Sequence, residues 1–411
     1  MISRFNGNFT QQPPIPEEGI HRAVEVMRSG RLHRYNVIDG EVSEAARLEQ
    51  EFADYLGIDY CLACASGGYA MQLALRALEL MPNEKVLTNG FTLSPVPGAI
   101  AAAGGCPVLV ETNENLVIDL DDLIRKSEDS GARLLLLSHM RGHIVDMDQL
   151  IQITEEAGIK VIEDCAHTMG ARWDGRNSGT HGLAACFSTQ TYKHINSGEG
   201  GFIASRDAGL MARATLLSGS YMLYGRHGTA PAQKVFEDFR LHTPNCSGRM
   251  DNLRAAILRP QLGMLDENVS HWNERYRTVH RILKRTPNIF LCERPEKEHF
   301  VGSSIQFSVD ALSVEGVGRF IDGCLERGVE LKWFGDPVPL AYTSRYDSWR
   351  YLQAQSLPRT DTILSRLFDM RIPLSFSISD CELIGNIIIE CLSGILNLRR
   401  NVTSRAAISD G

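Results

Sequence analysis

Two charged residues follow apolar segments in a way that would bring their side chains together. Asp164 ends the segment 160–164, and Lys193 follows the apolar stretch that begins at Phe187. Both segments are typical of buried strands, and the carboxyl ends of parallel strands open into one cleft. Burial there lowers the pKa of a lysine towards a nucleophilic amine, and a nearby carboxylate suits a cationic ring nitrogen. A Schiff-base lysine and an aspartate beneath a pyridinium nitrogen are the pair that pyridoxal phosphate (PLP) chemistry requires.

For any single pair of this kind, the alternative to a catalytic pair is a surface lysine and an aspartate that caps a strand. The surrounding elements distinguish these two interpretations. The short apolar runs expected as strands are YCLACAS, EKVLTNG, CPVLVE, RLLLLSH, KVIEDC and CFSTQ. The helices expected between them cover residues 69–80, 95–103, 120–126 and 147–157. This alternation predicts an α/β protein whose mainly parallel sheet is covered by helices on both faces. Both charged residues then lie at the edge where ligands bind.

The pattern changes after Pro260. Residues 261–286 are expected to form one long helix that leads out of the core, followed by pieces typical of a smaller α+β domain. The last residues have no apolar period and are expected to fray. We therefore expect a large PLP-binding domain with an N-terminal arm over 1–260, a smaller C-terminal domain over 261–400 and a flexible tail over 401–411.

Composition excludes several classes of protein. Of the 411 residues, 43% are hydrophobic and 22% are charged, and the formal net charge is −8. This charge, without a run of Lys or Arg, argues against nucleic-acid binding. No stretch is apolar enough to span a bilayer, and the polar start lacks the core of a signal peptide, so a cytoplasmic protein is expected. The ten cysteines are scattered, and Cys61 and Cys64 would point to opposite faces of a strand, so no metal site is expected.

Six segments in order along the chain resemble the landmarks of one family. They are ACASGGYAMQLALRAL, FTLSPVPGAIAAAGGCPVLVE, LLSHMRGHIVDMDQL, VIEDCAHTMGA, FSTQTYKHINSGEGGFIAS and SGRMDNLRAAILRPQL. Between about residues 31 and 283 the chain thereby resembles the DegT/DnrJ/EryC1/StrS aminotransferases. These are fold-type I PLP enzymes, many of which aminate keto sugars. The resemblance implies that fold, PLP as the cofactor, and a homodimer with shared active sites.

The resemblance also implies roles for the charged pair and its neighbours. Lys193 would form the Schiff base with PLP and then shuttle a proton, and Asp164 would keep the ring nitrogen protonated. Some relatives carry His in place of this lysine and catalyse dehydration, so the lysine favours transamination. His167 would lie beside the ring oxygen, with a buried core histidine as the alternative.

Ser66, Gly67 and Gly68 lie between a predicted strand and a predicted helix. Backbone N–H groups at the positive end of that helix would cradle a phosphate, with an ordinary tight turn as the alternative. By resemblance, Ser188 is a second phosphate ligand. The family usually has threonine at the third position, so Gly68 removes a hydroxyl ligand.

Two further departures from the family pattern concern the cofactor. Leu93 stands where the family usually has an aromatic residue that stacks on the pyridine ring. The family element G-x-N-x-R-M appears as NCSGRM, with Ser247 at the Asn position and Asn245 displaced by two. Either residue would reach the phosphate across a dimer interface.

Candidates for substrate binding lie further along the chain. Arg249 would bind a substrate carboxylate through its forked guanidinium, or pair with a carboxylate at the edge of the core. The segment 219–228 lies where the family places a substrate-side loop, and its candidates are Tyr221, Tyr224, Arg226 and His227. The aromatic segment 330–351 is either core or an altered substrate mouth, because it lacks the family's Y-x-P-x-H-like element.

Together these features predict a PLP-dependent aminotransferase. It would move an amino group from an amino-acid donor, with glutamate as the first choice, to a keto group of a sugar or a sugar-like or cyclitol intermediate of secondary metabolism. A PLP-dependent lyase or dehydratase is the alternative within this chemistry, because Leu93 and the missing C-terminal element indicate altered chemistry. A non-catalytic PLP-fold regulator is the alternative from another class, which the retention of Asp164 and Lys193 disfavours. No G-x-G-x-x-G follows the first strand, so a nicotinamide-binding enzyme lacks support.

Overall fold

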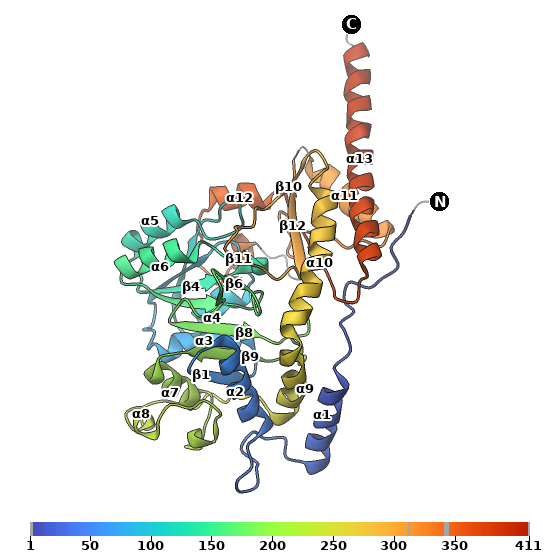
Figure 1. The fold of residues 1–411 in the computed structure, drawn as a ribbon. Helices are drawn as coiled ribbons and strands as arrows, with labels where there is room; N and C mark the ends of the chain where they lie inside the picture. The colour runs from blue at the N-terminus through green and yellow to red at the C-terminus, as the bar shows by residue number, and fades with distance from the viewer. Residues whose placement is uncertain (1–2, 311, 341–344, 410–411) are drawn as a thin grey trace.

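The computed structural model describes residues 3–310, 312–340 and 345–409. Its centre is a seven-stranded sheet in the order β1-β9-β8-β5-β4-β2-β3 (Figure 1). These strands are β1 Tyr60–Cys64, β2 Lys85–Asn89, β3 Cys106–Val110, β4 Leu134–Ser138, β5 Lys160–Asp164, β8 Ala184–Ser188 and β9 Gly201–Ser205. Every neighbouring pair is parallel except the two pairs that β9 makes with β8 and β1. The mainly parallel sheet is therefore confirmed, and β9 is a strand that the sequence analysis missed.

The sheet is covered by helices on both faces, as predicted. One face packs against α2 Glu44–Leu56, α5 Leu120–Ser130, α6 Met147–Glu156, α9 Asn252–Gly263 and the first half of α10 Leu265–Leu283. The other face packs against α3 Gly67–Ala77, α4 Pro95–Ala102 and α7 Ala208–Leu217. Alternation along β1 sends Cys61 into the first of these cores and Cys64 into the second, as expected.

A second hydrophobic core lies on a smaller antiparallel sheet in the order β10-β12-β14-β13. Its strands are β10 Ile289–Leu291, β12 Ser304–Val309, β13 Lys332–Trp333 and β14 Leu367–Arg371. The helices that pack on it are the second half of α10, α11 Val314–Glu326 and α13 Ile378–Ser409. Phe5 and Phe9, at the start of the chain, join this core beside Phe376. The expected smaller α+β part is thus present.

The remaining described elements are short or peripheral. They are α1 Glu17–Ser29, α8 Gln233–Glu237, α12 Pro358–Leu364, β6 Arg172–Trp173, β7 Arg176–Asn177, β11 Glu298–His299 and the 3₁₀ helices η1 Met140–Gly142, η2 Tyr224–Arg226 and η3 Tyr346–Ser348. Helix α1 packs along α9 at the edge of the molecule (Figure 1). Among the described residues, none of the helices combines the length and the apolar composition that a bilayer-spanning segment needs.

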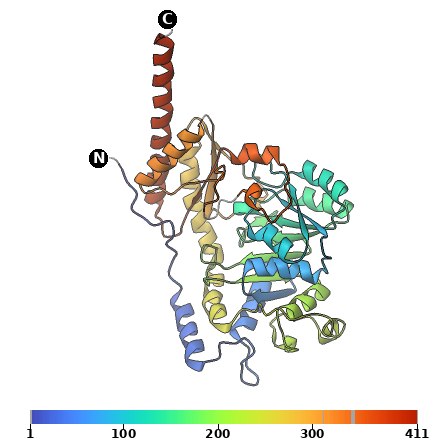
Figure 2. The same cartoon turned by 180° about the vertical axis from the view of Figure 1, so that it is seen from behind.

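Two predicted boundaries differ from the structure. The helix predicted over 261–286 is the end of α9 followed by α10, with Met264 between them. Because Val269 packs in the large core and Val279 in the small one, α10 belongs to both parts rather than to the smaller one alone. Helix α13 continues to Ser409 and extends beyond the rest of the chain (Figure 2), where a flexible tail was predicted from residue 401. Residues 410 and 411 of that tail lie outside the described residues.

Candidate active site

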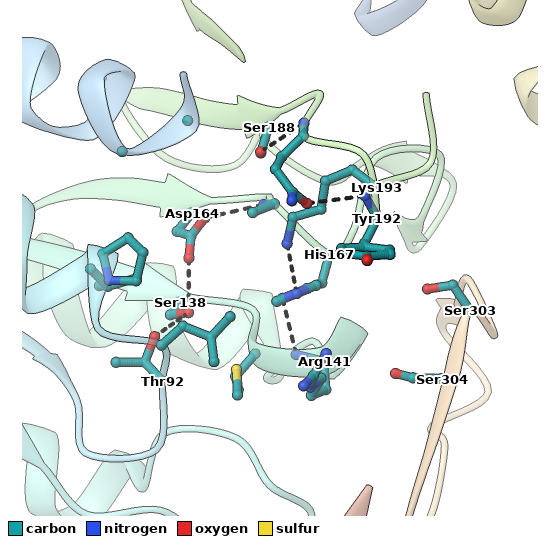
Figure 3. A pocket seen from close by; sticks show the side chains of 18 of the residues that line it. Thr92, Ser138, Arg141, Asp164, His167, Ser188, Tyr192, Lys193, Ser303 and Ser304 are labelled. Carbon is teal, nitrogen blue, oxygen red and sulfur yellow. Dashed lines mark hydrogen bonds between the residues drawn. The ribbon is translucent and has the colours of Figure 1, made fainter. Parts of the chain in front are cut away.

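The carboxyl ends of three neighbouring strands open into one cavity of about 610 Å³. The register of the sheet places Ser138, the last residue of β4, opposite Asp164, the last residue of β5. Ser188 ends β8, and the turn that follows carries Lys193. All four side chains line the cavity, together with His167 (Figure 3). The strand-end prediction that Asp164 and Lys193 share one cleft is therefore confirmed.

Lys193 contacts a histidine whose ring is oriented by the backbone. Lys193 Nζ lies 2.8 Å from His167 Nε2, and the N–H of Arg141 donates to His167 Nδ1 at 3.4 Å. A ring that accepts at Nδ1 carries its proton on Nε2 when neutral, so His167 donates to the Lys193 amine. Burial, followed by the charges of Lys193 and Arg141, lowers the pKa of His167 well below its ordinary value. His167 is therefore a neutral donor beside the amine.

The cavity keeps the Lys193 amine close to neutral. Burial lowers the pKa of Lys193 from 10.5 to about 7, Asp164 opposes this shift, and the charges of Arg141 and Arg371 add to it. A neutral amine is a nucleophile and a base, whereas an ammonium is neither. The structure thus provides the reactive form of lysine near neutral pH.

Asp164 is held by a chain of hydrogen bonds. Its Oδ1 accepts from the N–H of Ala166 at 3.1 Å, and its Oδ2 accepts from Ser138 Oγ at 2.9 Å. Thr92 Oγ1 in turn donates to Ser138 Oγ at 2.8 Å. Burial raises the pKa of Asp164, and the Ala166 hydrogen bond and the Lys193 charge act against this rise. The chain fixes the carboxylate in the cavity wall, where it can accept a hydrogen bond from a protonated ring nitrogen.

The start of α3 forms an anion cradle. Ser66 is the N-cap of α3, and its Oγ accepts from the N–H of Tyr69 at 3.0 Å. A Cβ on Gly67 would lie 2.8 Å from the Cβ of Ser188, so glycine is required for the helix to approach β8 this closely. Ser66, Gly67, Gly68 and Ser188 all line the cavity. Backbone N–H groups, two hydroxyls and the positive helix end suit a phosphate dianion.

The residues present fit PLP. An anion cradle, a lysine amine and a fixed carboxylate line one cavity, in the roles that the phosphate, the aldehyde and the ring nitrogen of PLP require. Leu93 lines the same cavity, as expected for a residue that packs against the ring. His167, left open between a cofactor neighbour and a core histidine, is part of the cavity wall.

Seven other predicted site residues do not line the cavity of their own chain. They are Asn245, Ser247, Tyr221, Tyr224, Arg226, His227 and Arg249. Asn245 Oδ1 accepts from the N–H of Ser247 at 3.0 Å, and the Tyr224 ring stacks on Phe236 at 4.0 Å between centroids. Their roles toward PLP or substrate remain predictions, which require that they face the cavity of a second subunit.

The two arginines of this group bind backbone carbonyls. Arg226 Nη1 donates to the carbonyl of Tyr35 at 2.8 Å, and Arg249 Nη1 donates to the carbonyl of Gly219 at 2.7 Å. The Arg249 guanidinium also lies 5.0 Å from the centre of the Tyr221 ring. Among the described residues, Arg249 contacts backbone carbonyls and the Tyr221 ring and forms no ion pair with a carboxylate, so the alternative of a carboxylate partner at the edge of the core is not supported.

Most of the described aromatic residues in the segment 330–351 are core. Phe334 packs beside Phe91, and Tyr346 and Trp349 share a cluster with Leu109. Residues 341–344 of the segment lie outside the described residues. The core interpretation is thus the one that these three side chains support.

A cluster of metal-ligand types needs no ion to explain it. His139, Glu163 and Cys165 bring one ligand atom each within 4.8 Å of one another. Glu163 lies 3.1 Å from the His139 ring and accepts from three backbone N–H groups, those of Gly179, His181 and Gly182. Both carboxylate oxygens are thereby used, so the cluster is structural.

A family model described as the DegT/DnrJ/EryC1/StrS aminotransferase family matches residues 14–388. The chain belongs to this family. The resemblance seen in six sequence segments is confirmed, and it extends over the small antiparallel sheet as well.

Individual relatives are distant. An L-glutamine:2-deoxy-scyllo-inosose aminotransferase from Streptomyces fradiae is 30% identical over 256 residues, which are 62% of this chain and 60% of the relative. A dTDP-3-amino-3,6-dideoxy-alpha-D-galactopyranose transaminase from Aneurinibacillus thermoaerophilus is 33% identical over 62% of this chain and 64% of the relative. The matches therefore span less than two thirds of these relatives. The crystal structure of 3-amino-5-hydroxybenzoic acid synthase has a TM-score of 0.80 at 23% identity, covers 94% of this chain and 99% of that one, and shows the shared fold.

Sequence analysis missed two positively charged residues of the cavity. Arg141 and Arg371 line the cavity, the first from η1 and the second from the end of β14. Arg141 follows the predicted strand β4 by three residues, which is a signal that could have found it. Arg371 carries no such signal, because it reaches the cavity only when the small sheet docks on the large one.

The two glycines of the cradle allow a matched test. We expect Gly67→Ala to weaken PLP binding by about 10-fold or more, because its Cβ would overlap Ser188. Gly68→Ala is expected to change it by less than about 2-fold, since the nearest atom to its Cβ would be Pro95 Cβ at 3.8 Å. The dissociation constant of PLP, measured by absorbance titration, distinguishes the two variants. Equal weakening by both would show that the cradle lies elsewhere.

Proposed function

We propose that this chain is a PLP-dependent aminotransferase of the DegT/DnrJ/EryC1/StrS family. The observation that carries the proposal is one cavity that contains the amine of Lys193, Asp164 and an anion cradle. The Lys193 amine has a lowered pKa and contacts His167. When bound, PLP supplies an aldehyde and a ring that withdraws electrons from the reacting carbon.

The chain's own residues divide the work of the reaction. Ser66, Gly67, Gly68 and Ser188 would hold the phosphate, and Asp164 would hold a proton on the ring nitrogen. Lys193 would bind the aldehyde covalently and, once displaced by the substrate amine, act as the base that moves a proton at the reacting carbon. His167 Nε2–H would hold the freed amine in place between these steps.

The substrates follow from the chemistry of the relatives. We propose an amino-acid donor, glutamate or glutamine, and a keto group on a sugar or cyclitol as the acceptor. One relative described above names L-glutamine and 2-deoxy-scyllo-inosose, and the other names a dTDP-linked amino sugar. Donor and acceptor would use the same cavity in turn. We further propose a homodimer in which Asn245 or Ser247 reaches the cavity of the second subunit.

One experiment tests the proposal directly. The absorbance spectrum of the purified protein with PLP is recorded before and after adding L-glutamate or L-glutamine, and a separate sample without donor is reduced with borohydride for peptide mapping. We expect a band that one of the donors removes, and a reduced adduct on Lys193. An adduct on another lysine, or a band that neither donor changes, would contradict the proposal.

The pH dependence of this capture is a separate prediction. Because the neutral amine reacts, the rate at which the apoprotein captures PLP should rise with pH, and it should level off above the Lys193 pKa of about 7. If the lysine had the ordinary pKa of 10.5, the capture rate would continue to rise up to much higher pH. Arg371→Gln removes a charge that lowers this pKa, so its midpoint should move to higher pH. Stopped-flow absorbance measures both profiles, and a midpoint near 10 in the unsubstituted protein would refute the assignment.

A further inference from the structure

Three cationic side chains gather around one buried carboxylate where the small sheet meets the cavity. Arg141 Nη2 lies 3.0 Å from Asp369 Oδ2. Burial is the largest effect on the pKa values of Lys332 and Arg371, and it lowers both. The charge of Arg141 also lowers these pKa values, and the charge of Asp369 raises them. The second oxygen of Asp369 is taken by Gln306 Nε2 at 2.7 Å. One carboxylate therefore faces three cations, which leaves the cluster with an excess of positive charge.

Arg141 is buried with unused hydrogen-bond donors. Its side chain is 6% exposed, and its Nε and Nη2 have no hydrogen-bond partner among the residues that the structure describes. The contact with Asp369 is an ion pair without hydrogen-bond geometry. Nε–H and Nη2–H lie on the same edge of a guanidinium and match the two oxygens of a carboxylate. A buried group with unmet donors of this kind indicates a ligand.

Both arginines lie next to the reacting lysine. The N–H of Arg141 contacts the same His167 ring that contacts Lys193 (Figure 3). The guanidinium of Arg371 lies 3.6 Å from the centre of the Tyr192 ring, and Tyr192 precedes Lys193 in the chain. Both arginines also line the cavity. A group bound between them would therefore lie in the same cavity as Lys193.

The other charges in the cavity leave this region positive. Asp164, at the end of β5, accepts hydrogen bonds from Ser138 Oγ and from the N–H of Ala166. Glu199, the other acid that lines the cavity, is exposed to solvent. Among the described residues, the carboxylate that pairs with Arg141 is that of Asp369 and not that of either of these acids.

We propose that Arg141 and Arg371 form a carboxylate subsite, so that the acceptor of this enzyme bears an acid group as well as its keto group. This rests on the proposed function, in which donor and acceptor occupy the cavity in turn. The carboxylate of an amino-acid donor would bind the unpaired donors of the Arg141 guanidinium. A neutral keto sugar would leave the buried donors of Arg141 unpaired in the second half-reaction, whereas a keto sugar acid or keto cyclitol acid would satisfy them.

The test compares two ligands that differ in charge. The probes are 3-oxocyclohexane-1-carboxylate and its neutral carboxamide, and calorimetry gives their dissociation constants for the PLP-loaded protein. We expect the acid to bind at least about 10-fold more tightly than the amide. Arg371→Gln and Arg141→Gln should each remove most of this preference, and Arg141→Lys, which keeps the charge but loses the fork, should retain part of it.

A matched control lies in the same segment as Arg371. Arg366 immediately precedes β14 and pairs with Asp310 at 2.9 Å, so Arg366→Gln removes an equal charge and should keep the preference. Because Arg141→Gln removes the buried ion pair with Asp369, Arg371→Gln carries the test if the Arg141 variant does not fold. Equal binding of acid and amide to the unsubstituted protein, or an undiminished preference in Arg371→Gln, would overturn the subsite.

The outcome is separable from that of the proposed function. Equilibrium binding of the probes needs no turnover, and the reduced adduct on Lys193 is measured in the same preparation. An adduct on Lys193 without an acid preference would overturn the subsite alone. An acid preference without that adduct would support the subsite and contradict the proposed function.

Discussion

Replacing Lys193 by alanine is expected to abolish both transamination and the reduced adduct with PLP. The amine is the group that would bind the aldehyde and then move the proton, and no second lysine among the described residues lines the cavity. We expect turnover to fall by about 10⁴-fold or more, since both roles are lost together. Half-reaction rates with L-glutamate and L-glutamine, with peptide mapping after borohydride reduction, measure the loss.

Lys160 provides the matched control for this variant. It is exposed at the start of β5, at the opposite end of the strand from Asp164, so Lys160→Ala should leave turnover and the adduct unchanged. The thermal midpoint of Lys193→Ala should not fall below that of the unsubstituted apoprotein, because a lysine with a lowered pKa gains no ion-pair stability from folding. Substantial remaining transamination in a folded Lys193→Ala protein would sink the assignment of this residue.

Asp164→Asn is expected to keep PLP bound but to lose most of the rate. An amide cannot hold a proton on the ring nitrogen as a carboxylate does, so the ring withdraws electrons less strongly from the reacting carbon. The cradle around Ser66 and Ser188 does not involve Asp164, so phosphate binding is preserved. We expect a loss of about 10²-fold to 10⁴-fold in the half-reaction, with a dissociation constant for PLP within about 10-fold of the original.

Ser138→Ala separates the charge of Asp164 from its orientation. This variant removes the hydrogen bond to Asp164 Oδ2 but keeps the carboxylate, which still accepts from the N–H of Ala166. Its rate should therefore fall by about 10-fold, the value of one lost hydrogen bond to a charged group. Near-normal rates in Asp164→Asn would mean that another group protonates the ring.

The carboxyl ends of the strands explain why so much of the site was predictable. Asp164 and Ser188 are the last residues of β5 and β8. Each strand has five residues and can be recognised in the sequence as a short apolar run that ends in a polar residue. Parallel strands bring such ends to one edge, so local pattern and fold class together were enough. Strand β9 was missed because its buried run follows a Gly-rich turn and pairs antiparallel, outside the strand–helix alternation.

Residues whose position depends on distant contacts were beyond the sequence. The cavity contains Arg371 because β14 docks at its edge, and no local pattern at Arg371 encodes that contact. Arg141 is buried with unmet donors, a property of its surroundings rather than of its neighbours in the chain. Tyr224 and Arg226 were expected near substrate from their place in a Tyr- and Gly-rich segment. Within their own chain one stacks on Phe236 and the other binds a carbonyl, so their role toward substrate remains a prediction.

The sequence by itself determined the α/β class and the position of Asp164 and Lys193 in one cleft. These depend on apolar periodicity and on residue type, which are local properties of the chain. Tertiary structure alone decided the proton position on His167, the pKa of Lys193 beside it and the excess of positive charge around Arg141. Each of these depends on desolvation and on charges brought together from separate elements, and such interactions exist only after the sheets have packed.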